Sequence, residues 1–162
     1  MRHTRSLDLK SYCISLDPGG TTGIALVEQE ERPWEVAVKQ LGPDEHHDNL
    51  LDFLRVWRPR YIVCESFQNR SFEAAKLIAP EYIGVVKLYV QDSSNRPVDI
   101  VWQSAALGKG FWDNNKLRAY NLYIPGMRHA RDAIRHYAYW RTFTLHDRSV
   151  LEGTIRPRVF GI

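Results

Sequence analysis

Two apolar runs in the first half of the chain each end in an acidic residue. Residues 12–16 (YCISL) precede Asp17, and residues 61–64 (YIVC) precede Glu65. A short continuous apolar run is typical of a strand buried inside a sheet. Between the two runs, apolar residues repeat at helical spacing over residues 44–57. We therefore expect a strand, a helix and a parallel strand, with both acids at one edge of the sheet.

The rest of the chain adds three strands and three helices to this unit. Strands are expected over residues 12–16, 23–27, 34–38, 61–64 and 97–102, and helices over residues 44–57, 71–92, 113–123 and 128–143. Pro80 should kink the second helix, residues 108–110 (GKG) should form a flexible loop, and Asp113 or Asn114 should cap the third helix. This order predicts an α/β fold with a five-stranded mixed sheet, its first three strands antiparallel, flanked by helices.

Length and composition restrict the class of protein. A chain of 162 residues with 44% hydrophobic and 25% charged residues predicts one packed domain over residues 1–162, with a core at about 12–143 and a tail at 144–162. Cys13 and Cys64 lie in apolar runs and lack metal-binding spacing, so we expect reduced core cysteines and a cytoplasmic location. No apolar stretch predicts a membrane span or a signal peptide.

Positive charge increases toward the C-terminus, although the net charge is only +3. The arginines there are Arg128, Arg131, Arg135, Arg141, Arg148, Arg156 and Arg158. They could form a basic side that faces a phosphate backbone. An ordinary solvated surface explains the same charges, so both interpretations stay open.

Three acids that are distant in sequence should meet in this fold. Asp17 and Glu65 end strands, and Asp132 lies near the start of the last helix. Clustered carboxylates repel one another unless a cation neutralises them, which predicts two Mg²⁺ or Mn²⁺ ions and phosphodiester hydrolysis. His129 shares a helix face with Asp132 and would bind an ion or move a proton.

Each of these residues has a simpler explanation. Asp17 is a common turn former before proline and glycine, and Glu65 could form a surface salt bridge. Asp132 could stabilise a helix N-terminus, and His129 could be a cap or a surface residue. All four explanations must hold together to remove the predicted site.

Three sequence blocks resemble the active-site blocks of RuvC Holliday junction resolvases, in the same order. They are residues 16–23 (LDPGGTTG), 63–67 (VCESF) and 129–133 (HARDA). The resemblance implies an RNase H-like fold and a homodimeric, Mg²⁺- or Mn²⁺-dependent endonuclease of DNA recombination and repair, which nicks four-way junctions. It assigns the acidic site to Asp17, Glu65, His129 and Asp132, and a short, divergent member of this kind would suit a phage.

The chain departs from the family pattern at two places. Its first turn is one residue shorter, and Gln103 stands where many members have a lysine. Residues 108–116 resemble the family's Gly-x-Gly…Lys stretch, so Lys116 is our preferred active-site lysine and Lys109 a second candidate. The other predicted DNA contacts are Phe67, Arg70, Arg128 and Arg131. Phe67 would either stack on a base or pack beneath the helix expected over residues 71–92.

A symmetric junction calls for two active sites, so we expect a homodimer, with Tyr82, Val86 and Tyr89 at its interface. Other functions remain open within this fold, including cleavage of forks, flaps or RNA–DNA hybrids and binding of branched DNA without cutting. Residues 17–23 (DPGGTTG) also resemble the phosphate loop of sugar kinases and actin-like ATPases. Those proteins need a second such domain, for which this chain is too short.

Overall fold

The computed structural model of the chain describes residues 11–30, 35–42, 44–45, 47–67, 78–92, 96–152 and 156–160. Its strands are β1 (Tyr12–Asp17), β2 (Thr22–Glu28), β3 (Glu35–Leu41), β4 (Tyr61–Glu65), β5 (Asp99–Gln103) and β6 (Arg156–Val159). Its helices are α1 (His47–Trp57), α2 (Ile78–Asp92), α3 (Ala105–Phe111), α4 (Asn114–Ala119) and α5 (Arg128–Tyr139). None of the helices in this part of the chain is long and apolar enough to cross a membrane.

The strands form one mixed sheet in the order β5-β4-β1-β2-β3-β6. β1, β2 and β3 are antiparallel, as predicted, and β4 and β5 continue the sheet parallel to β1. The predicted count of five strands is wrong, because β6 pairs in parallel with β3. β6 lies in the tail for which the sequence shows no pattern, since a short, largely exposed edge strand has little apolar periodicity.

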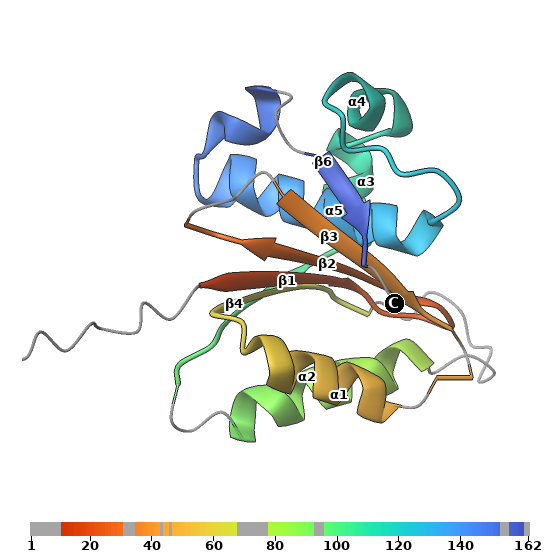
Figure 1. Cartoon of the computed structure of the whole chain (residues 1–162), viewed down its shortest axis with the longest axis vertical. Helices are drawn as coiled ribbons and strands as arrows, with labels where there is room; N and C mark the ends of the chain where they lie inside the picture. The colour runs from red at the N-terminus through yellow and green to blue at the C-terminus, as the bar shows by residue number, and fades with distance from the viewer. Residues whose placement is uncertain are drawn as a thin grey trace, which may run out of the picture.

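Helices α1 and α2 cover one face of the sheet, and α5 with α3 and α4 covers the other (Figure 1). The predicted interface residues Tyr82, Val86 and Tyr89 are at most 7% exposed and pack in the core beneath the sheet. They therefore cannot form a dimer surface, which corrects that prediction. Pro80 lies in the first turn of α2, where a missing backbone N–H leaves the helix intact. The predicted helical residues 71–77 lie outside the described part.

Helix α5 packs on the other face through small residues. Ala130, Ala133 and Ala138 are fully buried there beside Ile134 and Tyr137. Small side chains let a helix approach the sheet closely, and the tight packing fixes how far along the sheet its polar residues lie. The helix continues into a π-helical turn, Trp140–Thr144.

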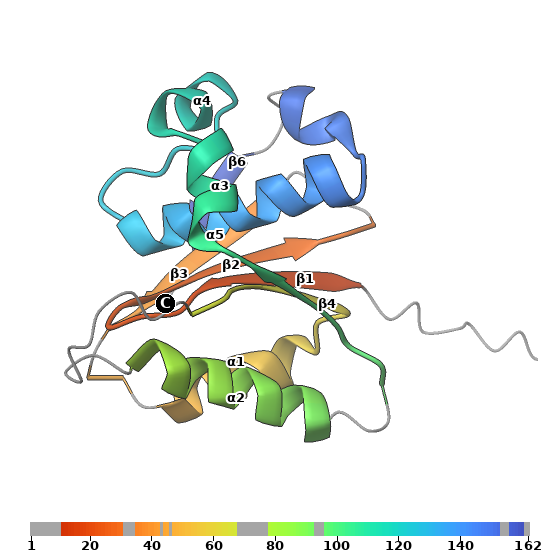
Figure 2. The ribbon, with the colours of Figure 1, turned by 180° about the vertical axis from the view of Figure 1, so that it is seen from behind.

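The GKG segment is helical, which corrects the loop prediction. Gly108 and Lys109 belong to α3, which lies against α5 (Figure 2). A Cβ atom at Gly108 would meet Arg135 Cβ and His136 Nδ1 at 3.3 Å, so the glycine permits a close approach to α5. Asp113 caps α4 as predicted, because its side chain accepts a hydrogen bond from the Lys116 N–H at 2.8 Å. Cys13 and Cys64 are buried and unpaired, as expected.

Candidate active site

Polar side chains line up across neighbouring strands. In the parallel register Leu16 lies opposite Cys64, so Asp17 and Glu65 occupy adjacent places at the ends of β1 and β4. Glu65 is in turn opposite Gln103 on β5. Their predecessors in β1 and β4 point to the α1–α2 core, and side chains alternate along a strand. The row formed by Asp17, Glu65 and Gln103 therefore faces α5.

One face of α5 supplies the groups above this row. His129, Asp132 and His136 are spaced three and four residues apart, which places them on one side of the helix. His129 Nδ1 lies 2.9 Å from Asp17 Oδ2 at one end of the row. His136 Nε2 lies 2.8 Å from Glu65 Oε2 farther along it. The structure thus brings Asp17, Glu65, His129 and Asp132 to one place.

Two residues of β2 and β3 fix where α5 begins. A Cβ atom at Gly23 would lie 2.0 Å from the His129 carbonyl oxygen, so only glycine permits the helix to start there. Gln40 Oε1 accepts hydrogen bonds from the backbone N–H groups of His129 (3.0 Å) and Ala130 (3.2 Å). This side chain satisfies two of the free donors at the helix start, since Met127 provides no cap. The sheet itself therefore positions His129.

Asp132 is buried between two cationic side chains. Its side chain is 4% exposed and is paired with the Arg135 guanidinium through Oδ1 and with Lys109 Nζ at 3.2 Å through Oδ2. Arg135 also donates to the Trp112 carbonyl and to Asn114 Oδ1, both at 2.6 Å. These bonds tie α5 to α3 and α4 and satisfy a charge whose burial would otherwise be costly.

Glu65 is also engaged with cationic or imidazole groups. Besides His136, Lys109 Nζ lies 3.9 Å from Glu65 Oε2. His136 is fully buried, and its Nδ1 lies 2.9 Å from Gln103 Oε1. Lys109, which comes from α3, therefore lies beside two acids of the site. The preference for Lys116 as the active-site lysine is corrected, because its Nζ lies over the Phe111 ring, 3.9 Å from the centroid.

The acids influence one another's ionisation. Burial, with repulsion from Glu65 and Asp132, raises the pKa of Asp17 to about 6, although its hydrogen bond with His129 and the charge of Lys109 oppose the change. Burial also favours a higher pKa for Glu65, but the hydrogen bond with His136 and the charge of Lys109 outweigh it and lower this pKa. The three carboxylates thus form one electrostatic cluster.

The cluster fits a divalent cation in charge and donor type. Asp17, Glu65 and Asp132 offer carboxylate oxygens, the ligands that Mg²⁺ and Mn²⁺ prefer. An ion would relieve the repulsion that raises the pKa of Asp17. Across the described residues, however, no group of three or more His, Cys, Asp or Glu side chains is arranged so that it could hold a metal ion. The carboxylates are instead paired with Lys109, Arg135 and the two histidines.

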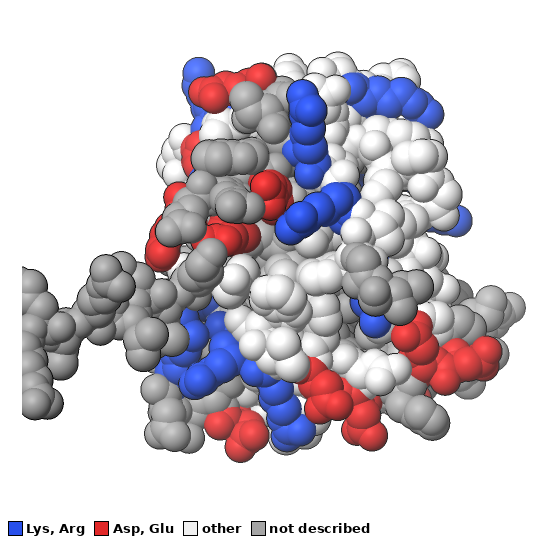
Figure 3. Space-filling model, in the orientation of Figure 1, with Lys and Arg blue, Asp and Glu red and all other residues white. Residues whose placement is uncertain are grey.

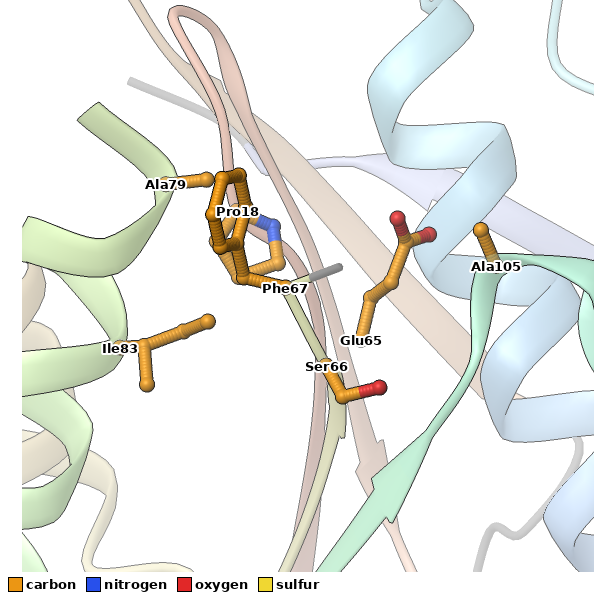
Figure 4. Close-up of a pocket in the computed structure, with 7 residues that line it drawn as sticks. All are labelled: Pro18, Glu65, Ser66, Phe67, Ala79, Ile83 and Ala105. Carbon is orange, nitrogen blue, oxygen red and sulfur yellow. The ribbon is translucent and has the colours of Figure 1, made fainter. Parts of the chain in front are cut away.

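A cleft opens beside Glu65 on the side of α2. Its volume is about 340 Å³, and Pro18, Phe67, Ala79 and Ile83 give it an apolar wall. Figure 4 shows the Phe67 ring beside Pro18 and Ala79, whereas the Glu65 carboxylate points toward α5. Phe67 is 41% exposed, so it does not pack fully beneath α2. An aromatic ring is thus available within the cleft that Glu65 lines.

The other predicted DNA contacts are arginines. Arg128 is exposed at the start of α5, and Arg131 stacks on Tyr123 at 4.8 Å from the ring centroid. Arg70 lies outside the described residues. On the face shown in Figure 3, Lys and Arg side chains alternate with Asp and Glu side chains. That face is not the uniformly basic side that the arginine-rich C-terminal half suggested.

Four residues around the acids were missed or misinterpreted from the sequence. The sequence presents Arg135 only as one of several C-terminal arginines and Gln103 only as a departure from a lysine, and it yields no prediction for His136 or Gln40. His136 could have been found, because it extends the His129 and Asp132 face by one more turn. Gln40 carries no such pattern, since its partner lies 89 residues away.

Known structures share this fold. RuvC of Thermus thermophilus in complex with a Holliday junction substrate is 17% identical, with a TM-score of 0.59 over 84% of this chain and 96% of that one. Ydc2, the yeast mitochondrial Holliday junction resolvase, is 11% identical, with a TM-score of 0.52 over 81% and 78%. The fowlpox virus Holliday junction resolvase is 11% identical, with a TM-score of 0.50 over 80% and 97%. No protein family model matches the sequence, and no curated protein does. The likeness establishes a RuvC-like fold, which fits the predicted RNase H-like class.

Proposed function

We propose that this chain is a divalent-metal-dependent endonuclease that cuts branched DNA such as four-way junctions. The observation that carries the proposal is the row of Asp17 and Glu65 facing Asp132 and His129 of α5. Its chemistry suits phosphodiester hydrolysis. The solved structures with this fold include junction resolvases, and RuvC and the fowlpox virus resolvase are both known with junction DNA.

The residues would divide the work as follows. Asp17, Glu65 and Asp132 would hold two Mg²⁺ or Mn²⁺ ions. When bound, such ions activate the attacking water and stabilise the leaving oxygen. His129, whose side chain is 35% exposed, would move a proton at the cleft or add a ligand. Lys109 would leave Asp132 and Glu65 and contact the phosphate, since its side chain is 43% exposed.

The cleft beside Glu65 supports a branched substrate. Phe67 would stack on a base that lacks a partner at the branch point, a contact worth about 1–3 kcal/mol. Arg128 and Arg131 would contact backbone phosphates along the start of α5, and Lys116 would contribute from α4. Regular duplex DNA presents no unpaired base, so this contact favours branched over linear DNA.

A junction has two strands to cut, so we propose a homodimer with two equivalent sites. The buried side of α2 is closed to a partner. Its outward side, where Leu88 is 56% exposed, is the alternative that we favour. Light scattering of the chain alone and of Leu88→Glu tests this: a dimer that becomes a monomer supports the proposed surface, and an unchanged dimer rejects it.

Cleavage of a synthetic four-way junction tests the main proposal. The junction is compared with linear duplex, a fork and an RNA–DNA hybrid, in Mg²⁺, Mn²⁺ or EDTA. Asp17→Asn should lower junction cutting by about 10³-fold, because a metal contribution of several kcal/mol is lost. Asp52→Asn, an exposed acid on α1, is the matched control and should cut normally.

The outcomes separate the alternatives. Symmetric, metal-dependent cuts in the junction that Asp17→Asn abolishes support a resolvase. A preference for the fork or the hybrid keeps the nuclease and changes its substrate. Junction binding without cutting in any metal rejects the enzyme in favour of a binding module. The pairing of all three acids with cationic or imidazole groups would then explain why the chain does not cut.

A further inference from the structure

A buried histidine contacts Glu65 from the side opposite the cleft. His136 is fully buried, and both ring nitrogens lie within hydrogen-bonding distance of a partner, Nε2 at 2.8 Å from Glu65 Oε2 and Nδ1 at 2.9 Å from Gln103 Oε1. Rotation of the ring would leave two buried polar groups without partners, which costs about 1–3 kcal/mol for each. The ring is therefore a fixed point for one oxygen of Glu65.

Gln103 restrains Glu65 by a second route. Its backbone carbonyl accepts hydrogen bonds from the Ser66 N–H at 2.7 Å and from Ser66 Oγ at 3.1 Å. Its side chain is 3% exposed and contacts His136. One residue of β5 thus holds both the backbone that follows Glu65 and the imidazole that meets its carboxylate.

Packing closes the remaining space around the ring. Helix α3 places Gly108 against His136, where even a Cβ atom would lie 3.3 Å from Nδ1 and 3.4 Å from Cε1. The ring is consequently restrained by hydrogen bonds at two atoms and by a helix backbone at its edge.

We propose that His136 and Gln103 are positioning residues that hold one oxygen of Glu65, so that its other oxygen is presented to Asp17 and to a bound divalent ion. The proposal rests on the proposed function, because it assigns Glu65 to the metal site. The alternative is a purely structural role, in which His136 only fills space in the core and Glu65 only serves as a hydrogen-bond partner for the buried imidazole.

Direct binding of Mn²⁺ to the full chain, measured by calorimetry without DNA, tests the proposal. His136→Met removes the contact with Glu65 and should weaken binding by about 10- to 100-fold, the usual effect of losing a group that orients a ligand. His136→Gln, whose amide can reach Glu65, should restore most of the affinity. In junction cutting, kcat should fall with the same ranking and KM should change little.

His47 provides a matched control on the other side of the molecule. Its Nε2 lies 3.1 Å from Glu81 Oε2, so it is also a histidine paired with a glutamate, but it joins α1 to α2. His47→Met should leave the Mn²⁺ affinity unchanged. If His136→Met does not fold, Gln103→Asn is measured instead: the shorter amide withdraws from the ring while the backbone contact with Ser66 stays, and binding should weaken by several-fold.

Three results would overturn the proposal: a folded His136→Met that binds Mn²⁺ as well as wild type, equal losses in His136→Met and His136→Gln, or a wild-type chain that binds no Mn²⁺. The proposed function fails separately. A wild-type chain that binds Mn²⁺ but cuts none of the DNA substrates contradicts the nuclease assignment, while the ranking of the His136 variants in Mn²⁺ binding still decides the positioning role.

Discussion

The two faces of the sheet bury comparable apolar clusters but differ in charge. Beneath α1 and α2 the cluster consists of aliphatic and aromatic side chains. Among the described residues, five charged or imidazole side chains are less than 10% exposed, and all of them lie on the α5 face. They are Asp17, Asp132, Arg135, His136 and Arg141. Burial of charge is costly unless it is paired. Both faces therefore bury apolar surface, and among the described residues the α5 face adds buried, paired charge, which is where we place the proposed site.

The largest change in stability should come from a buried charge on the α5 face. Arg135→Met leaves Asp132 with Lys109 as its remaining partner and deprives the Trp112 carbonyl of a donor. Breaking a buried pair costs about 3–5 kcal/mol. Arg55→Met on α1, which breaks an exposed pair with Asp52, should cost less than about 1 kcal/mol. Urea unfolding of both variants measures this, and equal costs would contradict the difference between the faces.

A core truncation on the other face should separate stability from activity. Leu54 is fully buried beneath the sheet, so Leu54→Ala should lower the free energy of unfolding by about 2–5 kcal/mol. Junction cutting per folded molecule should stay near the wild-type rate, because Asp17, Glu65 and Gln103 are not members of this cluster and their side chains face α5. The rate is measured well below the melting temperature, and a large loss of cutting there would show that the faces are not independent.

The sequence predicts some features of these two faces and not others. Asp17 and Glu65 were placed together because each ends an apolar run, and the parallel register of β1 and β4 follows from the intervening helix. Glycines favour loops, so the sequence predicts a loop at residues 108–110, whereas the contact between α3 and α5 needs Gly108. Tertiary packing overrides local propensity in such a case. β6 and the role of Gln40 depend on partners more than 80 residues away, which no local pattern encodes.

The start of α5 should couple stability to activity. A Cβ atom at Gly23 would overlap the backbone of His129, which cannot move aside as a side chain can. Gly23→Ala should therefore cost about 1–3 kcal/mol and shift His129 away from Asp17, with a loss of cutting at temperatures where the variant is folded. Gly110→Ala is the control, since a Cβ atom there meets nothing within 4 Å. Normal cutting by folded Gly23→Ala would separate the helix start from the site.

The acid row should also lower stability at neutral pH. Asp17 loses its proton at about pH 6 in the folded chain, compared with 3.8 as its ordinary value, because burial and the neighbouring carboxylates disfavour its charge. The folded state thus binds this proton more tightly, and the contribution of Asp17 to stability is lost as the pH rises from about 4 to 6. The side chain that Asp17→Asn introduces does not titrate. The free energy of unfolding of this variant, relative to that of wild type, should therefore increase by roughly 2 kcal/mol between pH 4 and pH 7.5.

Thermal unfolding of both proteins across this range, in EDTA, measures the difference. Asp52→Asn, which replaces an exposed acid on α1, is measured as the control. A constant difference between Asp17→Asn and wild type would mean that burial and the neighbouring carboxylates do not raise the pKa of Asp17 in the folded chain. The alternative result is a stability difference that grows with pH and disappears when Mn²⁺ is added, because Mn²⁺ stabilises only the wild type. This result would show that the charges buried on the α5 face lower stability because they form a cation site.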